Sequence, residues 1–60
     1  MTEHYTNLIY KLTMEAYTAF PEEVPAILTE TLQAMQLNLA AKRFAAVEWL
    51  ANWCIDFLAI

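Results

Sequence analysis

Apolar residues recur every three or four positions along the first third of the chain, which is the spacing of one helix face. Between residues 3 and 19 this stripe consists of Tyr5, Leu8, Ile9, Leu12, Ala16 and Ala19. Tyr10, Met14 and Tyr17 flank the stripe, and polar side chains lie opposite it. We therefore expect an amphipathic helix over residues 3–19, with Thr2 as its N-cap.

Two prolines in the segment FPEEVPA separate this helix from the next one. The residue before a proline avoids the α-helical region, so the first helix should end near Ala19. Proline is favoured at the first helical position, so the second helix should begin at Pro25 or one turn earlier. Its apolar face from Val24 to Leu39 predicts a helix over residues 25–37.

The apolar face then rotates by roughly 100° between residues 24–39 and residues 44–58, which predicts a break in the helix. Asn38 lies at this change of phase, and asparagine is common at helix ends. We place the break near Asn38 and a third helix over residues 39–59. The alternative is one continuous helix over 25–60, which would force dimerisation because it has nothing to fold back on.

The third predicted helix has a wider apolar surface than one neighbour needs. Its polar strip consists of Glu48, Asn52 and Asp56, and apolar side chains occupy the remaining arc of roughly 200°. Packing on one neighbour typically takes a stripe of about 100° or somewhat more. A second neighbour or another subunit must cover the excess. We assign core or self-association contacts to Leu50, Trp53, Cys54, Phe57 and Leu58.

These patterns predict an all-α protein with one domain over residues 1–60, built from three helices or from a helix and a helical hairpin. A chain of 60 residues has a marginal core, and such small domains usually need a further source of stability. A single cysteine excludes an internal disulfide. A partner chain remains as the source of the missing stability, so we expect the bundle to be completed as a homodimer.

The composition excludes several function classes. Glycine is absent, which disfavours hairpins and phosphate-cradling loops. The net charge is −4, and the three basic residues are Lys11, Lys42 and Arg43. Direct nucleic-acid binding needs more cations than this, so we expect none. An acidic chain can instead meet a basic surface on another protein, although solubility is the simpler explanation of its charge.

The chain also lacks the residues that catalysis and metal binding require. Serine is missing, and Cys54 lies on the apolar arc, where thiols are usually inert. His4 and Cys54 are far apart in sequence and do not form a paired metal-binding motif. We expect no enzyme activity, no metal and no cofactor.

We expect a cytoplasmic protein without a membrane span. Glu48 and Asp56 interrupt the apolar C-terminal stretch, and charges in a membrane segment are costly. The first residues lack the basic and apolar regions of a secretory signal. The unpaired Cys54 fits a reducing compartment.

Two residues of the third helix do not fit a simple core. Trp49 lies near the polar strip, so it either anchors a partner or packs at the edge of the first helix or of a dimer. Arg43 projects toward the apolar arc, where charges are seldom left unpaired. We expect a buried ion pair between Arg43 and Glu22, Glu23 or a partner chain, or else a side chain that reaches solvent at the helix start.

The leading interpretation is a small acidic helical regulator or inhibitor that binds another protein. The candidate partner-binding residues are Trp49, Tyr10, Tyr17 and Met14. It would occlude or disassemble its target in antirepressor fashion, as an antagonist of a nucleic-acid-binding or regulatory protein. Small chains of this kind are common in phages and plasmids, which is an association of class only. The alternatives are a structural subunit of a larger helical assembly and, less favoured because its polar face lacks basic residues, a peripheral membrane helix.

Overall fold

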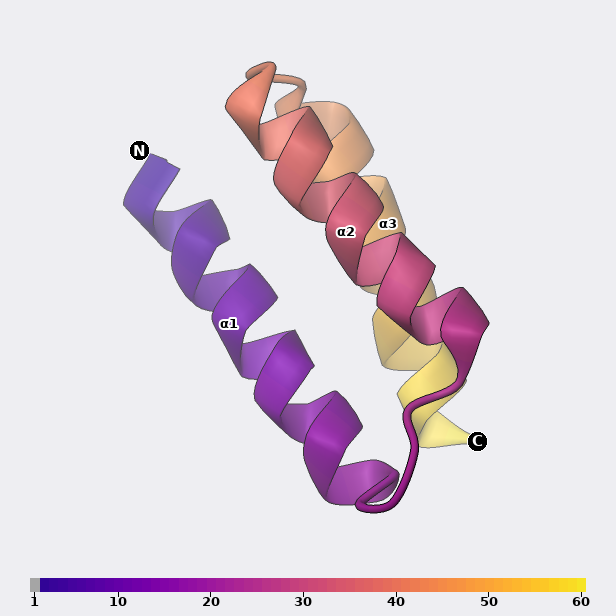
Figure 1. Cartoon of the computed structure of the whole chain (residues 1–60). Helices are drawn as coiled ribbons and strands as arrows, with labels where there is room; N and C mark the ends of the chain where they lie inside the picture. Colours follow the sequence, from indigo (N-terminus) through magenta and orange to yellow (C-terminus); the bar gives the residue numbers. More distant parts are fainter. Residues whose placement is uncertain (1) are drawn as a thin grey trace.

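The chain forms three helices in a computed structural model that describes residues 2–60 (Figure 1). Helix α1 spans Thr2–Ala19, α2 spans Ala26–Ala40 and α3 spans Phe44–Ala59. In Figure 1 the helices run down, up and down, so α1 and α3 point the same way with α2 antiparallel to both. No strand occurs within residues 2–60. The predicted all-α three-helix fold is therefore confirmed.

The first connection follows the proline pattern. Helix α1 begins one residue earlier than expected, at Thr2, and ends at Ala19 as predicted. Pro25 is the N-cap of α2, with φ −54° and ψ 140°. The carbonyl oxygen of Pro25 accepts hydrogen bonds from the amides of Leu28 and Thr29 at 3.0 and 3.1 Å. Helix α2 thus starts at Ala26, one residue after the expected start.

The second connection corrects the sequence prediction. The predicted break occurs, but it lies at residues 41–43 rather than at Asn38, because α2 continues to Ala40. The side-chain amide of Asn38 donates to the carbonyl oxygen of Ala34 at 2.7 Å, so the helix itself satisfies this polar group. A turn over residues 41–43 separates the two helices, so their apolar faces need not share one helical repeat. The continuous helix over 25–60 is wrong, and α3 begins five residues later than expected, at Phe44.

Lys42 adopts the left-handed conformation that ends α2, with φ 61°. The amide of Lys42 donates to the carbonyl of Leu39 at 2.9 Å, and the amide of Arg43 donates to the carbonyl of Asn38 at 2.8 Å. This pair of bonds is a Schellman motif, which usually has glycine at its left-handed position. The chain contains no glycine, so a lysine bears the conformational cost.

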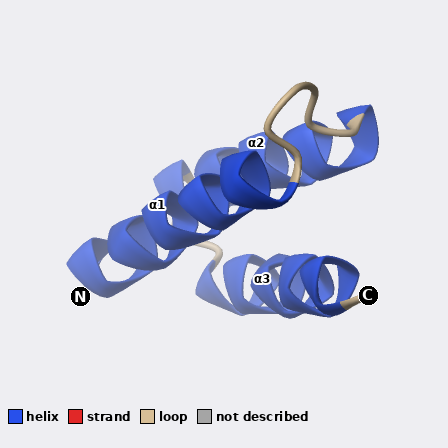
Figure 2. Cartoon of the chain, turned by 90° about the horizontal axis from the view of Figure 1, so that it is seen from below, coloured by secondary structure: helices blue, strands red, loops and turns tan. Residues whose placement is uncertain are grey.

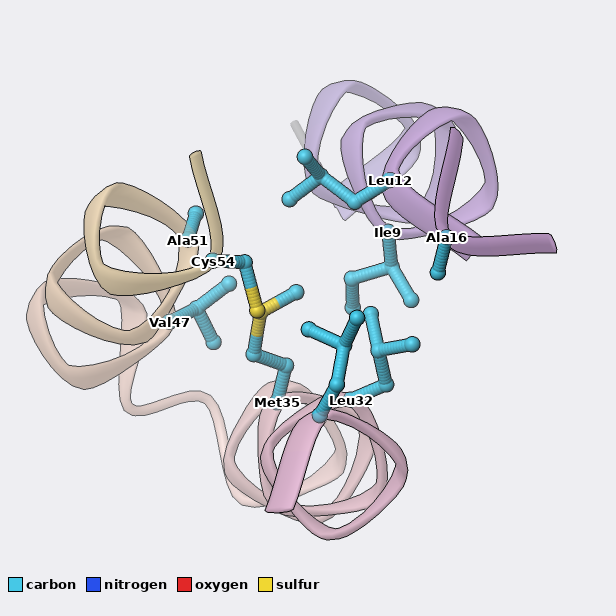
Figure 3. Close-up of a cluster of buried hydrophobic side chains, with 9 residues drawn as sticks. Ile9, Leu12, Ala16, Leu32, Met35, Val47, Ala51 and Cys54 are labelled. Atoms are coloured by element: carbon cyan, nitrogen blue, oxygen red, sulfur yellow. The ribbon is translucent and has the colours of Figure 1, made fainter. Parts of the chain in front are cut away.

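The core draws equally on all three helices (Figure 3). Its buried residues are Ile9, Leu12, Ala16, Leu28, Leu32, Met35, Val47, Ala51 and Cys54. Within each helix these residues are three or four positions apart, as one helix face requires. No polar or charged side chain of residues 2–60 is buried. The core is therefore held by apolar packing alone.

Aromatic pairs close both ends of the contact between α1 and α3. Near the start of both helices, Tyr5 stacks on Phe44 with ring centroids 5.0 Å apart. Near their ends, Phe20 lies 6.2 Å from Phe57, which stacks on Trp53 at 5.3 Å. Helix α3 packs on α1 and on α2, so two neighbours share its wide apolar arc.

Candidate interaction surfaces

The residues assigned to core or self-association pack within this chain. Cys54 is fully buried, and the other four, which pack against the core while partly buried, are Leu50, Trp53, Phe57 and Leu58. Their main contacts are thus made inside one chain. A further role in a homodimer stays a prediction.

Trp49 lies on the outer surface of α3. Its side chain is 70% exposed. It is two residues from Val47 and two from Ala51, both of which point into the core, so Trp49 projects about 160° away from them. Packing of Trp49 against α1 is thereby excluded, whereas a contact with a partner and the edge of a dimer core stay predictions.

The other three candidate residues lie together on α1. Tyr10, Met14 and Tyr17 are 68, 51 and 62% exposed, and their spacing puts them along one side of the helix. Trp49 lies on a different helix, α3. The four residues therefore belong to two surfaces rather than one.

Two adjoining hollows lie along the seam between α1 and α2. The larger, of about 430 Å³, is lined by Thr6, Ile9, Tyr10, Thr13, Gln36, Leu39 and Ala40. The smaller, of about 220 Å³, is lined by Thr13, Ala16, Tyr17, Val24, Thr29, Leu32, Gln33 and Gln36. Both are lined in part by Thr13 and Gln36, and the two hollows together are called here the α1–α2 groove. Sequence periodicity did not reveal it, because it depends on how two helices sit side by side.

The net charge of the protein is concentrated on α1, α2 and the loop between them. Residues 2–40 contain one basic residue, Lys11, and five exposed carboxylates: Glu3, Glu15, Glu22, Glu23 and Glu30. In residues 41–60 two basic residues balance two acidic ones. None of these carboxylates lines the α1–α2 groove, and on the helical repeat Glu15 and Glu30 project more than about 100° away from Tyr10 and Gln36, respectively.

The expected buried ion pair at Arg43 does not form, because the Arg43 side chain is exposed. Glu22 and Glu23 lie in the α1–α2 loop, whereas Arg43 lies at the opposite end of α2 (Figure 1). A helix of 15 residues is about 22 Å long, which is too far for such a pair. Arg43 instead reaches solvent at the start of α3. A pair with another chain stays a prediction.

A hydrogen bond that the sequence did not indicate joins α1 to α3. The hydroxyl of Tyr5 donates to Oε2 of Glu48 at 2.6 Å. This bond raises the pKa of Tyr5 above its ordinary value, because the bond favours the protonated phenol and the nearby carboxylate opposes the phenolate charge. The two residues are 43 positions apart, so no local spacing could have revealed the contact.

Burial raises the pKa of the Cys54 thiol, which keeps it protonated and a weak nucleophile. Within residues 2–60 no group of three or more His, Cys, Asp and Glu side chains is placed to hold a metal ion. No helix in that range is long and apolar enough to cross a membrane.

Comparisons with known proteins add no assignment. No protein-family model, no curated protein and no solved structure matches the chain. Any functional assignment therefore rests on the two exposed apolar surfaces and on the charge around them.

Proposed function

We propose that this chain is a small regulator that binds another protein and inhibits it by occlusion or disassembly. The observation that supports this most directly is the exposure of large apolar side chains on α1 and α3, at Tyr10, Met14, Tyr17 and Trp49. Isolated exposed apolar residues are common on any protein. Aromatic residues, however, are enriched at the energetic centres of interfaces, and three of these four are aromatic.

The charge suggests the kind of target. Residues 2–40, with five carboxylates and one lysine, attract a basic partner and repel an acidic one. Proteins that bind nucleic acids carry such basic surfaces. We therefore propose an antagonist of a nucleic-acid-binding or regulatory protein, located in the cytoplasm, where the unpaired Cys54 would stay reduced.

Photo-crosslinking in the cells that carry the chain tests this proposal. Benzoylphenylalanine replaces Tyr10, Tyr17 or Trp49 in separate variants, and exposed Glu30 serves as the control position. We expect a discrete adduct with another protein from at least one aromatic position and none from Glu30. Adducts only between copies of this chain, or equal labelling at every position, would contradict a regulatory partner.

The alternative is a structural subunit that is permanently buried in a larger assembly. Light scattering and circular dichroism on the purified chain, across a dilution series, separate the two roles. A regulator should stay helical and soluble at every concentration, either as a monomer or as the expected homodimer. A structural subunit should aggregate or lose its helices without its partner.

A further inference from the structure

We propose that the α1–α2 groove receives a basic amphipathic helix of the partner, which docks as a fourth helix of the bundle. This inference rests on the proposed protein-binding function and adds the site and the chemistry of the partner. It excludes the Trp49 surface of α3 as the primary site.

The shape of the groove suits a helix. Its two hollows, of about 430 and 220 Å³, share Thr13 and Gln36 as lining residues and lie between α1 and α2. These two helices run side by side (Figure 2). Tyr10 and Tyr17 line one side and are about 10 Å apart along the axis of α1. A docked helix places its own apolar residues at positions i and i+7 with the same spacing.

The lining has an apolar floor and uncharged polar sides. Ile9 and Leu39 line the larger hollow, and Leu32 and Val24 line the smaller one. Thr13 and Gln36, where the hollows meet, carry no charge. A side chain of leucine size can therefore enter without burying a charge, which would be costly.

Carboxylates lie near both ends of this groove. Glu3, Tyr10 and Tyr17 are seven residues apart, so Glu3 continues the tyrosine side toward the N-terminal end of α1. At the other end, Glu23 directly precedes Val24, which lines the smaller hollow. Lys11 projects about 100° away from Tyr10. A helix with an apolar face and basic flanks would meet apolar contacts in the groove and opposite charges beyond it.

The same charges argue against a second copy of this chain as the occupant. Residues 2–40 of each copy carry five carboxylates and one lysine, so two copies placed with α1 and α2 face to face would repel each other. Helix α3 of another copy offers no compensating charge, because residues 41–60 have as many acidic as basic side chains. The partner is therefore a different, basic protein segment.

The test uses two model peptides of five helical turns with the same leucine face, one with lysine and one with glutamate at all other positions. Amide NMR of the isotope-labelled full chain locates the binding site, and the titration gives Kd. We expect the lysine peptide to bind at least about tenfold more tightly than the glutamate peptide. The shifted amides should lie along the groove in α1 and α2.

Two substitutions at Gln36 test the site itself. Gln36 is exposed and lines both hollows, so neither change should disturb the fold, which circular dichroism verifies. Gln36→Lys should weaken binding of the lysine peptide by about tenfold or more, and Gln36→Glu should maintain or strengthen it. Asn52→Lys on α3 changes the net charge equally but is exposed and far from the groove, so it should weaken binding less than about threefold.

Several results would overturn the inference. These are shifts centred on Trp49 and α3, equal affinity for the two peptides, equal weakening by Gln36→Lys and Asn52→Lys, or no binding of the lysine peptide at all. The crosslinking experiment separates this failure from failure of the proposed function. A partner adduct from Trp49 alone would reject the groove and leave protein binding intact, whereas no partner adduct at any position would reject both.

Discussion

Replacing Lys42 with glycine should stabilise this protein. Lys42 has φ 61°, and its amide and that of Arg43 make the two hydrogen bonds that end α2. The side chain is exposed, so the substitution removes no core contact. Its main effect is on the backbone, because glycine has no Cβ to clash in the left-handed conformation.

The magnitude follows from two opposing contributions. The left-handed conformation costs a residue other than glycine or asparagine about 1–2 kcal/mol. Glycine offsets part of this stabilisation, by about 0.5–1 kcal/mol, because the unfolded chain of the glycine variant is more flexible and loses more entropy on folding. Taking the middle of both ranges, the net increase in the free energy of unfolding should be about 0.75 kcal/mol. For a domain of this size, that raises Tm by about 3–6 °C.

Thermal and urea unfolding, followed by far-ultraviolet circular dichroism at one protein concentration, measures this change. Lys42→Ala is the matched control, because alanine keeps the Cβ and loses only the charge. That charge lies between the C-terminus of α2, where it is favourable, and the N-terminus of α3, where it is not, so the control should change stability little. Equal stability of the glycine and alanine variants, or a loss in the glycine variant, would refute the reasoning.

Three further predictions concern the core residue Met35, the hydrogen bond between Tyr5 and Glu48, and the buried thiol of Cys54. Met35→Ala should lower the free energy of unfolding by about 2–5 kcal/mol in urea titrations, whereas Leu37→Ala, at a 72% exposed side chain, should change it by less than about 0.5 kcal/mol. Because the pKa of Tyr5 is raised in the folded protein, this group stabilises the fold below pH 10.0, and the stabilisation is lost as pH rises through the folded pKa. Residue-resolved NMR should show a lower Tyr5 pKa in Glu48→Gln than in the unsubstituted protein. Cys54, whose pKa is raised by burial, should react slowly with a disulfide reagent until urea unfolds the bundle. Fast reaction without urea would contradict its burial.

Periodicity predicted the elements that apolar burial determines. The stripe on α1 contained Ile9, Leu12 and Ala16, and all three are core residues. Proline chemistry placed the end of α1 at the correct residue, since Pro21 constrains the residue before it. These features depend on residues close together in sequence, and local rules describe them well.

The break between α2 and α3 shows where local rules fail. Asparagine is common at helix ends, yet the side-chain amide of Asn38 donates to the carbonyl oxygen of Ala34 inside the helix. Lys42 has no intrinsic preference for the left-handed conformation, but the packing of α3 against both other helices requires a reversal near it. The Tyr5–Glu48 bond and the α1–α2 groove likewise arise from tertiary arrangement, so no spacing in the sequence predicts them.

The apolar C-terminal helix contributes to the core, whereas the proposed binding residues Tyr10 and Tyr17 lie outside it. Its wide arc suggested another subunit, but α1 and α2 cover much of it within one chain, with Phe20 reaching Phe57 at the end of the bundle. Tyr10 and Tyr17, by contrast, are mostly exposed and contribute little to that core. If the groove is the binding site, replacing Tyr10 with alanine should weaken peptide binding while stability changes far less than in a core variant. A protein whose binding residues were also its core residues would lose both together.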